Sequence, residues 1–169
     1  MDLFLLRHGE AGTRKAASVR DRERPLTAAG EEELEKVGRA MMESGFEFDV
    51  VASSPLKRAF DSAMLVNKAL GRKAKVEEWT ELSPEGSREN LYGRLAKLKP
   101  GSSVLIVGHE PYMTSAIGEI TGRGRESSTG FRISLKKAGM AKVAVDGFTP
   151  KINGELRWLL TPRQIRKMA

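Results

Sequence analysis

The stretch Leu3-Phe4-Leu5-Leu6-Arg7-His8-Gly9, residues 3–9, decides how the rest of the chain is interpreted. Its first four residues form a short, uninterrupted apolar run, which is typical of a β-strand covered on both faces. Sheets of that kind carry helices on either side, and they bind ligands beyond the carboxyl ends of their strands. The sequence therefore predicts that Arg7 and His8, directly after the run, lie at the binding edge of a sheet.

The same pattern recurs along the chain. Residues 49–53 and 103–107 indicate two more buried strands, and residues 75–77 a short third one. Helices are expected between the strands: one capped by Thr27 and ended by Ser44-Gly45, one with Ser54 as N-cap and Pro55 as its first residue, one marked by Leu91, Leu95 and Leu98, and one over 112–120.

The last third of the chain differs from the rest. Residues 122–130 are rich in Gly, Ser and Arg, which predicts a loop, and residues 140–145 and 156–160 alternate apolar with small or polar side chains. We expect the two alternating stretches to form an antiparallel strand pair at one sheet edge, followed by a short basic helix or a frayed end over 163–169. The fold class is thus α/β, a three-layer α/β/α arrangement with a mainly parallel central sheet and an antiparallel edge. The absence of repeats and long linkers predicts one domain over 1–169.

Composition excludes several classes of protein. Of the 169 residues, 40% are hydrophobic and 30% charged, as in ordinary globular proteins. Cys is absent, which rules out disulfides, thiolate metal sites and cysteine nucleophiles. No apolar run approaches the roughly 20 residues of a membrane span. The opening segment carries Asp2 where a signal peptide needs basic residues, so we expect a cytoplasmic protein without membrane contact. The net charge of +7 favours anionic partners.

The chain has two histidines, and both follow predicted strands. His8 comes directly after the first strand and His109 directly after the strand that ends at 107. Arg58 lies in the first turn of a helix that also follows a strand. Parallel strands end at the same edge of a sheet, so two imidazoles and the guanidiniums of Arg7 and Arg58 should converge there. Such a group describes an oxyanion site, with phosphate as the expected anion.

At this point a family resemblance becomes specific. The tripeptide Arg7-His8-Gly9 after an N-terminal strand resembles the signature of the histidine phosphatase superfamily. Supporting segments follow in the family's order: Arg24-Pro25-Leu26-Thr27 with Gly30, Ser53-Ser54-Pro55 with Arg58 and Ala59, and Gly108-His109. The short length, residues 81–86 and the ending Leu160-Thr161-Pro162 resemble the SixA group, the protein phosphohistidine phosphatases. The resemblance implies a phosphoglycerate-mutase-like fold with little or no lid over the site.

The resemblance also implies a mechanism. His8 would be the nucleophile and would become a transient phosphohistidine. Arg7, Arg58 and His109 would hold the phosphoryl oxygens, a task that needs no metal and no cofactor. Glu81 is the positional match for the general acid of relatives that cleave phosphate esters. A phosphohistidine substrate needs less help from an acid, because imidazole is a less basic leaving group than an alkoxide.

Three functions remain open on the sequence alone. The leading hypothesis is a phosphatase that acts on a phosphohistidine-bearing protein, such as a phosphotransfer domain of a signalling phosphorelay. Basic residues in the loop from Arg14 to Arg24 would then face that partner's acidic surface. The second is a phosphomonoesterase for sugar or nucleotide phosphates, with Glu81 as the acid. The third, supported by net charge alone, is a nucleic-acid-binding module without catalysis.

Overall fold

A six-stranded sheet forms the centre of the protein in the computed structural model, which describes residues 1–12, 21–71, 75–122 and 133–169. The strands are β1 (Asp2–Arg7), β2 (Val50–Ser53), β3 (Glu77–Glu78), β4 (Ser103–Gly108), β5 (Met140–Gly147) and β6 (Asn153–Leu160). They lie in the order β3-β2-β4-β1-β5-β6. The first four run parallel, and β5 and β6 form the antiparallel edge. The predicted mixed sheet is confirmed.

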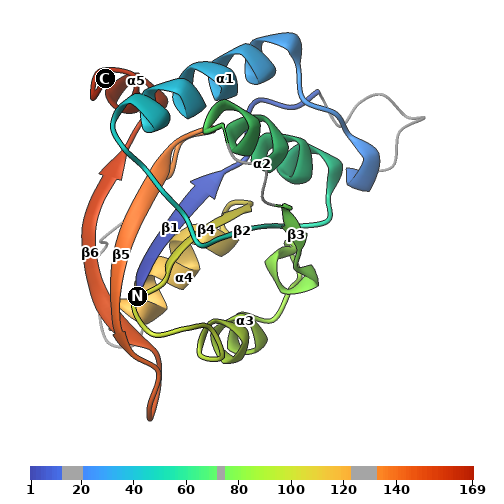
Figure 1. The fold of residues 1–169 in the computed structure, drawn as a ribbon. Coiled ribbons are helices and arrows are strands. Elements are labelled where there is room, and N and C mark those ends of the chain that lie inside the picture. Colours follow the sequence, from blue (N-terminus) through green and yellow to red (C-terminus); the bar gives the residue numbers. More distant parts are fainter. Residues whose placement is uncertain (13–20, 72–74, 123–132) are drawn as a thin grey trace.

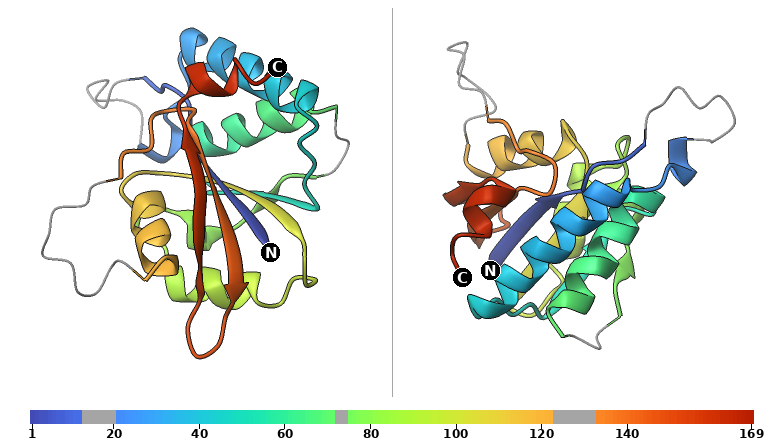
Figure 2. Two further views of the ribbon diagram at one scale, coloured as in Figure 1. Left: turned by 90° about the vertical axis from the view of Figure 1, so that its left-hand side faces the viewer. Right: turned by 90° about the horizontal axis from the view of Figure 1, so that it is seen from above.

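Helices cover both faces of the sheet (Figure 1). One layer holds α1 (Ala28–Glu43), α2 (Lys57–Ala69) and α5 (Pro162–Ile165), and the opposite layer holds α3 (Arg88–Leu95) and α4 (Tyr112–Ile120). Two single turns, η1 (Asp21–Glu23) and η2 (Thr80–Leu82), lie in the connections. Figure 2 shows the three layers edge-on, with the sheet between the two sets of helices. The predicted α/β/α architecture is thus confirmed.

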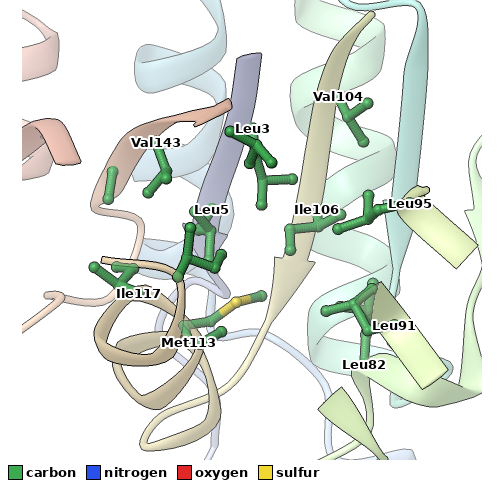
Figure 3. Packing of buried hydrophobic residues seen from close by; sticks show 14 of the residues in the cluster. Leu3, Leu5, Leu82, Leu91, Leu95, Val104, Ile106, Met113, Ile117 and Val143 are labelled. Atoms are coloured by element: carbon green, nitrogen blue, oxygen red, sulfur yellow. The ribbon is translucent and has the colours of Figure 1, made fainter. Parts of the chain in front are cut away.

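Strand β1 is buried on both faces, as its apolar run predicts. Leu3 and Leu5 pack into the cluster under α3 and α4, whereas Phe4 and Leu6 pack into the cluster under α1 and α2. Figure 3 shows Leu5 and its partner on β4, Ile106, beside Met113 of α4. Successive side chains of a strand point to opposite faces, so a run of four apolar residues feeds two cores at once.

The helix boundaries follow local signals, with one informative exception. Thr27 caps α1, because its side-chain oxygen accepts a hydrogen bond from Gly30 N. The prediction that Ser54 caps the next helix is wrong. Helix α2 begins at Lys57 with Leu56 in the cap position, and the Ser54 hydroxyl is used elsewhere. The short third strand also lies slightly later than predicted, at Glu77–Glu78.

Parts of two predicted loops, residues 13–20 and 123–132, lie outside the described residues. The basic residues Arg14, Lys15 and Arg20 are among them. Within the ranges that are described, no helix combines the length and the apolar character that a membrane crossing needs.

The parallel strands end together. Arg7 of β1 pairs with Gly108 of β4, and Ser53 of β2 pairs with Val107 of the same strand. The ladders continue by one residue on each side: His8 N donates to the Gly108 carbonyl at 3.0 Å, and Ser54 N donates to the Val107 carbonyl at 3.0 Å. The residues directly after three strands are therefore held at one level of the sheet edge.

Candidate active site

Two imidazoles meet at this edge. The ring centroids of His8 and His109 are 5.1 Å apart, and the ring planes are inclined by 57°. His8 is 8% exposed and His109 is 2% exposed. The strand ends that carry them are adjacent in the sheet, because β1 pairs with β4. The sequence-based expectation that the two histidines come together agrees with this geometry.

The imidazole of His8 is held in one tautomer. Its Nδ1 lies 2.7 Å from the carbonyl oxygen of Gly9. A carbonyl only accepts hydrogen bonds, so Nδ1 carries the proton and Nε2 keeps its lone pair. Gly9 itself is held by α2: its N–H donates to Ser62 Oγ at 3.1 Å, and Ser62 Oγ donates to the Arg58 carbonyl at 2.6 Å. A buried helical serine thus holds the residue whose carbonyl orients the His8 ring.

His109 has a different kind of partner. Its Nε2 lies 2.9 Å from Ser54 Oγ, inside a fully buried environment. The Ser54 oxygen also accepts a hydrogen bond from Leu56 N at 3.3 Å. The turn between β2 and α2 therefore presents its serine to the ring at the end of β4.

Arg58 lies in a network with Asp21 and Arg24. Its guanidinium donates from Nη1 to the Asp21 carbonyl at 2.9 Å and from Nη2 to Asp21 Oδ2 at 3.2 Å. Arg24 Nη2 lies 3.2 Å from the other carboxylate oxygen of Asp21. The Arg58 side chain is 5% exposed, and these contacts hold it in its buried position. Asp21 thus lies between two guanidiniums beside the histidines.

Arg7 and the backbone of His8 rest on residues 135–139. Arg7 Nη1 donates to the Leu135 carbonyl at 2.9 Å. Ala138 N donates to the carbonyls of Arg7 and His8 at 3.0 and 3.2 Å, and Arg7 N donates to the Gly139 carbonyl at 3.1 Å. Ala138 adopts a left-handed conformation with φ of 53°, which lets the chain turn tightly beneath the two residues. The C-terminal third of the chain therefore forms the support for the first strand's end.

Burial and nearby cations keep both imidazoles neutral. Burial is the largest cause that lowers the pKa of His8 from 6.5 to about 4, and Arg58, Arg7 and Arg24 add to it, against the Gly9 hydrogen bond. Burial lowers the pKa of His109 to about 3, helped by His8 and Arg58 and opposed by Asp21. A neutral His8 with a free lone pair on Nε2 has the form that a nucleophile requires.

Glu81, the candidate acid, lies against a cation. Arg94 Nη1 is 3.2 Å from Glu81 Oε1 and 3.3 Å from Oε2, and the Arg94 guanidinium stacks 4.4 Å from the Trp79 ring centroid. No hydrogen bond or ion pair joins Glu81 to the four candidate residues within the described chain. A second carboxyl, Glu110, follows His109 directly, and burial raises its pKa while Thr114 donates to it at 2.7 Å.

Sequence reasoning missed Ser62 and Asp21 and assigned Ser54 a different role. Ser62 lies on the buried side of α2, where its polar side chain among apolar neighbours was the available signal. Asp21 lies in a segment without periodicity, and nothing in its neighbourhood indicates a partner 37 positions away. Arg24, which belongs to the segment Arg24-Pro25-Leu26-Thr27, lies near both histidines, since its charge lowers the pKa of each.

The arrangement suits an oxyanion. The charges of three arginines act on His8, and the His109 ring lies beside it. A guanidinium binds phosphate through two N–H groups at once. In the part of the chain that is described, no three His, Asp or Glu side chains gather closely enough to bind a metal ion. Chemically, a lone pair on nitrogen beside several cationic donors fits transfer of a phosphoryl group to His8.

Comparison with known proteins agrees with this chemistry. The sequence model of the family described as "Histidine phosphatase superfamily (branch 1)" matches residues 3–84. An uncharacterized protein of Picosynechococcus is 33% identical over 143 residues, which are 83% of this chain and 82% of that protein. A 2,3-bisphosphoglycerate-dependent phosphoglycerate mutase of Treponema pallidum is 39% identical over 112 residues, which are 65% of this chain and 43% of the mutase.

Among solved structures, the protein histidine phosphatase SixA in complex with tungstate has a TM-score of 0.82 and 25% sequence identity. The similarity covers 98% of this chain and 99% of that one. The similarity to this neighbour therefore extends over nearly the whole chain, beyond the residues that the family model matches.

Proposed function

Because this chain belongs to the histidine phosphatase superfamily, we propose that it removes the phosphoryl group from phosphohistidine on another protein. The observation that carries the proposal is the pairing of a neutral His8, with its lone pair on Nε2, with His109 at a ring distance of 5.1 Å beside buried Arg58. The full-length similarity to SixA, itself described as a protein histidine phosphatase, supports this substrate class.

The reaction proceeds in two displacements. Nε2 of His8 attacks phosphorus, a new P–N bond forms, the P–N bond of the substrate breaks, and the released imidazole takes up a proton. Water then attacks the phosphoryl group on His8 and yields orthophosphate and free His8. The first step moves the phosphoryl group from nitrogen to nitrogen, and the second breaks the P–N bond to His8 and moves the group to the oxygen of water, both without a change in oxidation state.

Arg7, Arg58 and His109 stabilise the charge on the transferred group. Two guanidiniums offer paired donors to phosphoryl oxygens, and their positions are set before the substrate arrives by Leu135 and Asp21. Donors that need no reorganisation contribute most to the rate, because the barrier then contains no cost of orienting them.

The substrate preference follows from the leaving group and from access. Glu81 is paired with Arg94, which suits a reaction in which the departing imidazole needs little protonic help. Between β3 and β4 the chain holds only η2 and α3, in place of a long covering insertion. We expect a site without such an insertion to admit a side chain displayed on a second protein, such as a phosphotransfer domain of a phosphorelay.

The test is loss of label from a phosphotransfer domain that carries [³²P]phosphohistidine. Wild-type protein is expected to release orthophosphate, His8→Ala is expected to release none above background, and Ser102→Ala serves as the matched control. Ser102 is a buried serine at the opposite end of β4 that donates to the Lys99 carbonyl. Release by His8→Ala at the wild-type rate would refute the proposal.

A second candidate is a phosphatase for small phosphate esters. The similarity to a phosphoglycerate mutase favours it, because phosphoglycerate is itself a small phosphate ester. An alkoxide leaving group needs a proton, so this function requires a carboxylic acid, Glu81 or Glu110. Rapid turnover of sugar phosphates that is lost in Glu81→Gln or Glu110→Gln would establish the ester-cleaving function. Phosphohistidine cleavage that is indifferent to both changes would favour the first proposal.

A further inference from the structure

The buried hydroxyl of Ser54 has two polar neighbours in the described part of the chain. Leu56 N lies 3.3 Å from Oγ, and His109 Nε2 lies 2.9 Å from it. A backbone N–H can only donate, so Oγ accepts from Leu56. The hydroxyl proton then has one acceptor within reach, the lone pair of His109 Nε2. Ser54 is fully buried, and a buried hydroxyl proton is rarely left without an acceptor.

This hydrogen bond decides where the proton on His109 lies. When Nε2 accepts, a neutral imidazole carries its proton on Nδ1. The Nδ1 atom of His109 is buried and has no hydrogen-bond partner among the described residues. The ring therefore has an N–H to offer to a ligand oxygen, on a side chain that lies 5.1 Å from the His8 ring and within the field of the Arg58 charge.

We propose that Ser54 is a positioning residue that holds His109 in the Nδ1–H tautomer, so that His109 donates a hydrogen bond as a neutral imidazole to an oxygen of the bound phosphoryl group. The identity of the ligand rests on the proposed function, whereas the tautomer does not. Ser54 acts through His109, whose Nε2 it contacts.

Both histidines then carry their proton on Nδ1, but different kinds of partner fix it there. His8 has its proton placed on Nδ1 by an acceptor, the Gly9 carbonyl, and His109 has its proton placed on Nδ1 by a donor, the Ser54 hydroxyl. The low pKa of His109, which burial and the charge of Arg58 bring to about 3, agrees with a neutral ring at physiological pH. With His109 neutral, no positive charge lies on the ring next to His8.

Nitrogen NMR tests the tautomer directly, without substrate. The chain has two histidines, so protein labelled with [¹⁵N]histidine gives four ring-nitrogen signals, and His109→Gln assigns them. We expect the Nε2 signal of His109 at a shift typical of a lone-pair nitrogen and its Nδ1 signal at one typical of N–H. An Nε2–H signal in the wild-type protein overturns the inference, and this measurement requires no variant at position 54.

Variants at Ser54 test the cause and the consequence. In Ser54→Ala the Nε2–H form should become populated, and the affinity for orthophosphate, measured by calorimetry, should fall about tenfold, the effect of one lost hydrogen bond to a charged group. Ser54→Thr keeps the hydroxyl and is expected to restore both readouts. Ser102→Ala, a buried serine outside the site, should change neither.

The outcomes separate this inference from the proposed function. A Ser54→Ala protein that keeps the Nδ1–H tautomer and binds orthophosphate like the wild type would overturn the role of Ser54. A shift of Ser54→Ala to the Nε2–H form with tenfold weaker orthophosphate binding supports that role, even where the phosphohistidine assay shows no turnover and the proposed function fails.

Discussion

Acidification should destabilise this protein through its two buried histidines. In the folded state the pKa of His8 is lowered from 6.5 to about 4 and that of His109 to about 3. In the unfolded chain both imidazoles take up protons near the ordinary value of 6.5. The unfolded state therefore binds more protons as the pH falls, and stability is lost from about pH 6.5 down to about pH 4 for His8 and about pH 3 for His109.

The magnitude at about pH 5 depends little on the folded-state values, because both lie below that pH and both rings remain neutral in the folded protein. Protonating one imidazole of ordinary pKa at about pH 5 stabilises the unfolded state by about 2 kcal/mol. The two histidines together should therefore lower the free energy of unfolding by about 4 kcal/mol between about pH 7.5 and about pH 5.

Urea unfolding followed by tryptophan fluorescence measures this loss, since Trp79 is 1% exposed and becomes solvated on unfolding. The matched control is the double variant His8→Gln/His109→Gln, which keeps every carboxylate and removes the imidazoles. The wild type should lose about 4 kcal/mol more than the control over the same pH range. A difference below about 1 kcal/mol would mean that the folded protein protonates these rings, and the neutral nucleophile would be refuted.

Three further outcomes are expected. Ser62→Ala leaves Gly9 N without its acceptor, which should lower the free energy of unfolding by about 1–3 kcal/mol and the melting temperature by about 2–12 °C. Calorimetry of this variant beside Ser62→Thr and Ser102→Ala measures the effect. An unchanged melting temperature would contradict the expectation. Gly30→Ala places a Cβ 2.3 Å from the Glu10 carbonyl oxygen, so α1 must shift and urea unfolding should show a loss of about 1–3 kcal/mol. Orthophosphate at about one hundred times its Kd should add about 2.7 kcal/mol and raise the melting temperature by about 5–10 °C, a shift that should vanish in the double histidine variant.

The order of elements was predictable because it depends on patterns that are local in sequence. Four consecutive apolar residues in β1 require cover on both faces, and Phe4 and Leu5 indeed pack into opposite cores. The convergence of His8 and His109 followed from the same reasoning, since parallel strands end at one edge.

The predictions failed where a distant contact overrides a local preference. Ser54 before Pro55 is a strong helix-start signal, yet its hydroxyl is bound to His109, 55 positions away, and the helix begins three residues later. Asp21 shows the same limit: its carboxylate binds Arg58, and no periodicity or motif around residue 21 points to that partner. Pairings of this kind are set by tertiary packing, which a single sequence does not display.

The place of β1 in the sheet has a consequence for how the protein is made. Strand β1 is translated before both of its neighbours in the sheet, because Asp2 pairs with Ser103 on one side and Ala144 on the other. Neither neighbour exists until most of the chain has been translated, and non-local pairing of this sort slows folding. Strand β1 must therefore wait with two unpaired edges until these neighbours are made, and an unpaired edge is open to aggregation with other chains.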